Sequence, residues 1–131
     1  MKFLGTGSAL PKKVVSNDDL AQVMDTSDEW IRSRTGIGMR HIAVEETTTS
    51  MAVEAAEKAL ADAKISGCEI DLIIAGTISP DYIFPSLACE VQAAIGAKSA
   101  TAFDLSAGCS GFLFALATGD AYFRTGRYKH A

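Results

Sequence analysis

The residues with the most reactive side chains are the three cysteines, Cys68, Cys89 and Cys109. Their number is odd and they lie far apart, and neither a Cys-x-x-Cys pair nor a histidine cluster accompanies them. This spacing argues against a disulfide framework and against a zinc site, so no metal is expected. Unpaired thiols fit a reducing compartment, which predicts a cytoplasmic location.

Cys109 has the surroundings of a nucleophile. It lies in the segment SAGCSGF (106–112), after a strand-like run, TAFDLS (101–106), and before a very apolar run that begins at Phe112. A thiol at the N-terminus of a helix faces unpaired N–H groups whose partial positive charge favours the thiolate. The small neighbours allow a carbonyl group to approach, and the N–H of Cys109 itself can donate to a developing oxyanion.

The layout around Cys109 resembles a nucleophile elbow, although the G-x-S-x-G pattern is absent. The alternative is a small buried residue at a crowded strand–helix turn, because free cysteines are commonly buried and inert. That structural interpretation is the one we give to the other two thiols. Cys89 lies in the middle of an expected helix, and Cys68 lies in a polar turn.

Strand patterns cover residues 2–5, 71–79 and 101–106. The second of them, DLIIAGTIS, is a continuous apolar run of the kind found in parallel strands that are buried on both faces. The polar stretch 40–49 is expected to be a connection. Because strands alternate with helices, the sequence predicts an α/β fold with a parallel sheet and helices on both of its faces.

Helix patterns have start and stop signals. Asn17 is expected to cap a first helix, and Thr26 with Glu29 makes a capping box for a second helix that ends at Gly36. Further helices are expected over 50–64, with an ion pair between Glu54 and Lys58, from Pro85–Ser86 to Gly96, and over 110–125.

Composition bounds the class of protein. The 131 residues are 48% hydrophobic and 21% charged, which is typical of a soluble globular domain. No apolar run approaches the ~20 residues that span a bilayer, and the N-terminus is too weakly apolar for a secretory signal, so no membrane partner is expected. A net charge of −4 predicts no nucleic-acid partner.

Four blocks resemble, in order along the chain, the N-terminal portion of the β-ketoacyl-ACP synthase III group of the thiolase-like superfamily. They are GTGSALP (5–11), DTSDEWIRSRTGI (25–37), FPSLACEVQ (84–92) and AFDLSAGCSGF (102–112). The resemblance implies a layered αβαβα fold. Residues 1–131 would be the N-terminal part of a condensing-enzyme domain, the first half-repeat only and incomplete, with the C-terminal half absent.

The resemblance also implies the reaction. Cys109 would take an acyl group from acyl-CoA as a thioester, and malonyl-ACP would lose CO2 to give a carbanion that attacks this acyl group. The product would be a 3-oxoacyl-ACP that starts fatty acid synthesis. Acyl-CoA would be a substrate, so no cofactor is expected, and the acyl carrier protein would be a partner.

Other site residues follow from the family positions that they match. Trp30 and Arg34 lie four residues apart on one helix face and match residues that bind CoA by adenine stacking and phosphate contact. Thr26 is a further candidate at that site. Phe84 matches a position that lines the acyl pocket of the partner subunit in a homodimer. From the residues alone, the alternatives are a core aromatic for Trp30, a solvated face for Arg34 and ordinary packing for Phe84.

Two alternatives to the complete enzyme stay open. The family uses a Cys-His-Asn triad, and its histidine and asparagine would lie in the second half, so this chain alone is expected to be incomplete for condensation. The chain is then either part of a condensing enzyme or a non-catalytic fragment or interaction subunit of the same fold. Relatives of similar local sequence make polyketide or quinolone products instead of fatty acids.

Overall fold

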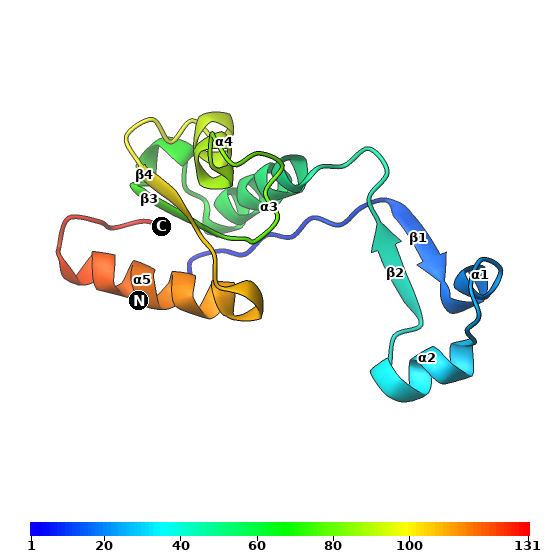
Figure 1. The fold of residues 1–131 in the computed structure, drawn as a ribbon. Coiled ribbons are helices and arrows are strands. Elements are labelled where there is room, and N and C mark those ends of the chain that lie inside the picture. The colour runs from blue at the N-terminus through cyan, green and yellow to red at the C-terminus, as the bar shows by residue number, and fades with distance from the viewer. The chain divides into compact units, whose positions relative to one another are not determined.

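The computed structural model describes all residues, Met1–Ala131, and divides them into two compact units (Figure 1). The larger unit consists of Met1–Ala9 and Thr47–Ala131. The smaller unit is Leu10–Glu46. No helix in either unit is both long enough and apolar enough to cross a membrane.

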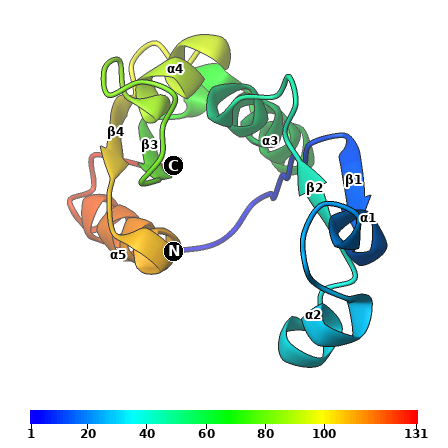
Figure 2. The same ribbon diagram turned by 45° about the vertical axis from the view of Figure 1, so that its right-hand side comes forward.

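The larger unit is built on two parallel strands, β3 (Leu72–Gly76) and β4 (Thr101–Leu105), paired in register from Leu72 opposite Thr101 to Gly76 opposite Leu105. Helix α4 (Leu87–Ala94) packs on one face of the strands, with α3 (Thr48–Ala63) beside it, and α5 (Gly111–Arg124) packs on the other face (Figure 2). The predicted α/β class, with a parallel pair and helices on both faces, is confirmed.

The core of the larger unit lies between β3 and α4. Its fully or nearly buried apolar side chains are Ile70, Leu72, Leu87, Ala88, Val91 and Ala97. Leu72 is 0% exposed, at the start of the apolar run that predicts a buried strand. Two short 3₁₀ turns, η1 (Gly67–Glu69) and η2 (Gly108–Ser110), lead into β3 and α5.

The smaller unit is an antiparallel pair, β1 (Lys13–Ser16) and β2 (Met39–Ile42), with two short helices between the strands. These helices are α1 (Asn17–Ala21) and α2 (Asp28–Thr35). Helix α2 ends at Gly36, which has a φ of 73° and donates its N–H to Arg32, so the predicted stop signal is confirmed. The prediction of a connection over 40–49 is wrong for residues 40–42, which belong to β2; the sequence pattern misses this strand because its antiparallel partner β1 lies far away in sequence.

Two predicted helix starts are corrected. Ser16, and not Asn17, caps α1, in a capping box in which its hydroxyl accepts from the N–H of Asp19 and its own N–H donates to the Asp19 carboxylate. Ser27, and not Thr26, caps α2 by accepting from the N–H of Trp30. In both cases a serine one position away has the extended backbone that a cap requires.

The expected strand at residues 2–5 is wrong. Met1–Ala9 carries no strand, and its glycines lie directly against the backbone of α3. A Cβ on Gly7 would lie 2.0 Å from the carbonyl oxygen of Ala55, and one on Gly5 would lie 2.5 Å from that of Ala59. The glycines of this segment therefore serve a close approach to a helix.

The longer helices match their patterns. Helix α3 has the predicted ion pair, with Lys58 Nζ 2.6 Å from Glu54 Oε1. Helices α4 and α5 lie where expected and are followed by Gly96 and Gly126, which have φ values of 74° and 75°. These helices were predictable because their apolar periodicity and their stop signals are local.

Candidate functional site

Cys109 occupies the turn η2, between the end of β4 and the first residue of α5, as the sequence predicts. The turn is closed by a hydrogen bond from the Ser110 N–H to the Ala107 carbonyl, 3.1 Å long. Gly108 has a φ of 52°, in the left-handed region that favours glycine. The free Cys109 is exposed. The alternative interpretation, a small residue buried in a crowded turn, therefore does not describe it within this chain.

A backbone contact that the sequence did not reveal fixes this turn. Gly111, the first residue of α5, is buried against Gly76, the last residue of β3. A Cβ on Gly76 would lie 3.0 Å from the carbonyl carbon of Gly111 and 3.3 Å from the Phe112 nitrogen. Any larger residue at position 76 would push away the start of the helix that follows Cys109.

The other two cysteines have structural surroundings. Cys89 is half-buried in α4, with its sulfur 3.9 Å from the carbonyl oxygen of Ala102. Cys68 is exposed in η1 and its thiol donates to the Ser66 hydroxyl at 3.3 Å. No group of three or more His, Cys, Asp or Glu side chains is arranged to hold a metal ion.

Trp30 and Arg34 are brought together on α2 in the smaller unit. The guanidinium carbon of Arg34 lies 4.5 Å from the centre of the Trp30 ring, a cation–π distance. The indole is 54% exposed, so it is not a core aromatic. Thr26 is half-buried just before the Ser27 cap, at the N-terminal end of the helix, where Trp30 also lies.

Phe84 lies in the loop that joins β3 to α4, shortly before the Ser86 cap of α4. Its side chain is 87% exposed, and its neighbour Ile83 is 98% exposed. Ordinary packing, the alternative for Phe84, therefore does not describe its surroundings within this chain. The exposure of two large apolar side chains to water is unfavourable unless a partner covers them.

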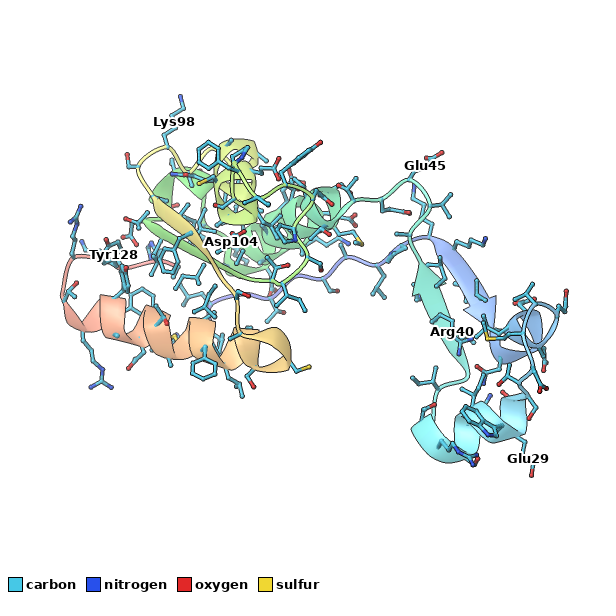
Figure 3. The ribbon with its side chains drawn as sticks, in the orientation of Figure 1. Glu29, Arg40, Glu45, Lys98, Asp104 and Tyr128 are labelled. Carbon is cyan, nitrogen blue, oxygen red and sulfur yellow. The ribbon has the colours of Figure 1, made fainter.

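Two carboxylates anchor this loop, Asp81 from within the loop and Asp104 at the start of the helix that follows it, and no sequence pattern indicated either of them. Asp81 accepts the first two N–H groups of α3, from Thr48 at 3.1 Å and from Thr49 at 2.7 Å. Asp104, on β4, accepts the first two N–H groups of α4, from Leu87 at 2.9 Å and from Ala88 at 2.8 Å (Figure 3). Each carboxylate thus satisfies helix donors that would otherwise lack partners.

The bonds to α3 predict an acid transition at Asp81. The Thr49 N–H above all, together with the Thr48 N–H, lowers the pKa of Asp81 from 3.8 to about 2. Because this pKa is depressed, the stabilisation from the two hydrogen bonds to Asp81 is complete above the ordinary pKa of 3.8. It is lost as the pH falls through about 2. NMR titration should show the Thr48 and Thr49 amide shifts changing near pH 2, and Asp81→Asn should abolish that change. A midpoint near pH 3.8 would contradict the stabilisation of the Asp81 carboxylate by these two hydrogen bonds.

Comparisons with known proteins found relatives that match nearly the whole chain. Residues 103–131, which include Cys109, match the family model described as 3-oxoacyl-[acyl-carrier-protein (ACP)] synthase III. The chain is 56% identical over 129 residues to β-ketoacyl-[acyl-carrier-protein] synthase III 1 of Bacillus anthracis, covering 98% of this chain and 42% of that protein. The chain thus spans about two fifths of the length of the curated relatives it matches.

Solved structures have the same fold. The 3-oxoacyl-[acyl-carrier-protein] synthase III of Aquifex aeolicus matches with a TM-score of 0.94 and 53% identity, over 98% of this chain and 42% of that one. A priming β-ketosynthase from a polyketide biosynthetic pathway matches with a TM-score of 0.86 and 40% identity, over 89% and 35%. The predicted thiolase-like fold is thereby confirmed. Over nearly its whole length, the chain is thus similar to part of the β-ketoacyl-[acyl-carrier-protein] synthase III enzymes.

Proposed function

We propose that this chain is the acyl-accepting portion of a β-ketoacyl-ACP synthase III, and that Cys109 is the nucleophile. The observation that carries the proposal is the exposed Cys109 in the turn between β4 and α5, inside the stretch that matches the family model. A thiol in such a turn is open to a substrate. The Ser110 N–H of the same turn is already bonded to the Ala107 carbonyl, so the N–H of Cys109 itself is the donor that we propose for a developing oxyanion.

Two steps follow from this role. The Cys109 thiolate attacks the thioester carbonyl of acyl-CoA, a carbon–sulfur bond forms to the enzyme, and CoA leaves as a thiolate that takes up a proton. Malonyl-ACP then loses CO2, and its carbanion attacks the acyl-cysteine, giving a 3-oxoacyl-ACP and freeing the thiol. Covalent catalysis divides acyl transfer from carbon–carbon bond formation.

The second step needs groups that we place outside these residues. We propose that residues 1–131 form the N-terminal part of the condensing-enzyme domain and that a C-terminal half supplies the histidine and asparagine of a Cys-His-Asn triad. Neither histidine of the chain is a substitute. His41 contacts the carbonyl oxygen of Pro11 at 2.6 Å, and His130 contacts that of Glu69 at 3.2 Å.

For CoA, we propose that Trp30, Arg34 and Thr26 bind the nucleotide end. The exposed indole offers a flat face on which adenine can stack, and a guanidinium pairs with phosphate. Their contact at 4.5 Å supports a joint role, because the guanidinium is held beside the ring that would take the base. Acyl-CoA is then a substrate, and neither a metal nor another cofactor is invoked.

For Phe84, we propose that a second copy of the protein covers it in a homodimer, with the phenyl ring lining the partner's acyl pocket. The 87% exposure of this side chain and the two carboxylate anchors of its loop support a presented side chain. We further propose that the protein works in the cytoplasm, with the acyl carrier protein as its partner.

A second candidate is a priming synthase of polyketide type, which the 40% identity to such an enzyme favours. The acyl-cysteine step is common to both candidates, so only the product of condensation separates them. A non-catalytic interaction subunit of the same fold differs from both, because it has no use for a reactive thiol at position 109.

The test is acylation by acetyl-CoA, followed by intact mass spectrometry. We expect one acetyl adduct on the wild-type chain, none on Cys109→Ala, and an unchanged adduct on the matched controls Cys68→Ala and Cys89→Ala. Acetylation without condensation in the presence of malonyl-ACP is the expected result for this chain alone. A folded chain that takes up no acetyl group, or that keeps the adduct after Cys109→Ala, would overturn the proposal.

A further inference from the structure

Asn17 is the most enclosed residue of the smaller unit. It is 1% exposed, and no other residue of Leu10–Glu46 is buried. The large apolar side chains of this unit are mostly exposed, among them Val14, Val23, Met24, Ile37, Met39, Ile42 and Val44. The order of the unit therefore rests on polar contacts more than on an apolar core.

The amide group of Asn17 spans the two ends of α2. Its Nδ2 donates to Asp28 Oδ1, at the first residue of the helix, and to the carbonyl oxygen of Ile37, just beyond the Gly36 stop, both at 2.7 Å. The backbone N–H of Asn17 donates to the carbonyl oxygen of Gly38 at 3.2 Å. One residue thus grips both ends of an eight-residue helix, which would be marginal in isolation.

The third side-chain contact joins the amide to the strands. Asn17 Oδ1 accepts from Arg40 Nη2 at 2.5 Å, and Arg40 Nη1 donates to the Val15 carbonyl oxygen at 3.1 Å (Figure 3). The amide hence lies between the Asp28 carboxylate and the Arg40 guanidinium, with its N–H toward the negative group and its oxygen toward the positive one. Every polar atom of the buried amide has a partner.

The residue type is specific to this place. A carboxylate at position 17 would face the carboxylate of Asp28 and would have no N–H for Ile37. An apolar side chain would leave the Arg40 guanidinium and the Ile37 carbonyl without this partner, which is unfavourable where they are partly buried. Only an amide donates N–H groups to Asp28 and Ile37 and also accepts from Arg40.

We propose that Asn17 is a positioning residue for nucleotide binding, which holds α2 at both ends so that Trp30 and Arg34 present their stacked pair to the CoA adenine and phosphates. The inference rests on the proposed function for its ligand. Asn17 itself touches neither Trp30 nor Arg34, and its effect passes through the placement of α2. If Asn17→Ala leaves α2 in place in only about a tenth of the molecules, the observed Kd for CoA rises about tenfold.

The first arm of the test needs no ligand. Trp30 is the only tryptophan of the chain, so its fluorescence reports on α2. We expect Asn17→Ala to raise acrylamide quenching of Trp30 and to lower its anisotropy. The matched control is Gln22→Ala, at an exposed position just after α1, and it should leave both unchanged. Unchanged Trp30 fluorescence in Asn17→Ala would overturn the positioning role.

The second arm measures CoA affinity by calorimetry in a mutant cycle with the double variant Trp30→Ala, Arg34→Ala. We expect Asn17→Ala to weaken CoA binding about tenfold in the wild-type background and to have little further effect in the double variant, because both side chains that Asn17 positions are then absent. The half-saturating acetyl-CoA concentration for Cys109 labelling should rise while the maximal rate stays constant. An equal loss of affinity in both backgrounds would refute the inference. A wild-type chain that binds no CoA would instead refute the proposed function, and the fluorescence arm would then decide on Asn17.

Discussion

Trp30→Ala is expected to weaken CoA binding by about tenfold to a hundredfold, because stacking of a base on an aromatic side chain contributes ~1–3 kcal/mol. The structure supports a loss at the upper end of this range. Arg34 lies 4.5 Å over the same ring, so removal of the indole also frees the guanidinium from its support. Isothermal titration of CoA into the variant measures the change.

Two further substitutions separate the contribution of the Trp30 ring to CoA affinity from that of the Arg34 charge. Trp30→Phe keeps an aromatic face and should restore most of the affinity lost in Trp30→Ala. Arg34→Lys keeps the charge but lacks the planar group that stacks on the indole, so it should bind CoA more weakly than the wild type and with a similar salt dependence. An alanine at position 30 that binds CoA as tightly as tryptophan does would exclude stacking on this residue.

The parts of the fold that were predictable from sequence are those with local signals. The apolar run 71–79 contains β3, and the helix pattern of 50–64 differs from α3 by two residues at its start and one at its end. The capping signals were less reliable, because Ser16 and Ser27 compete with Asn17 and Thr26 at adjacent positions. Only the backbone conformation decides between such neighbours.

The parts that were not predictable depend on contacts between distant residues. Strand β2 exists because β1 pairs with it across two helices, and Met1–Ala9 lies along α3 in place of forming a strand. Asn17 looked like a cap because its side chain is a common cap. Its real partners, Asp28, Ile37 and Arg40, are 11 to 23 residues away.

The features of the candidate site likewise divide into those that were predictable from the sequence and those that were not. Cys109 was predictable because its small neighbours and the strand–helix junction lie together in one short segment of the sequence. The contact between Gly76 and Gly111 and the two carboxylate anchors were missed, because each joins residues of separate elements. A sequence pattern thus identifies the reactive atom more readily than the groups that hold its surroundings.

Asp104→Ala is expected to destabilise the larger unit by about 3 kcal/mol, because hydrogen bonds to a charged group contribute ~1.5–3 kcal/mol each and two of them are lost together. The amides that lose their acceptor belong to Leu87 and Ala88, which are 5% and 0% exposed. Water therefore reaches these donors poorly once the carboxylate is gone. The third amide of α4, that of Cys89, keeps its bond to the Ser86 hydroxyl.

Hydrogen exchange read at Leu87–Val91, together with urea unfolding, measures the effect of Asp104→Ala. The matched control is Asp62→Ala, which removes one carboxylate bond to the exposed N–H of Thr6 and should change stability by less than about 1 kcal/mol. Because α4 begins just after Phe84 and β4 leads directly to Cys109, fraying at Asp104 should also slow acetylation of the thiol. Equal protection of Leu87 and Ala88 in the wild type and in Asp104→Ala would show that this carboxylate does not hold the helix.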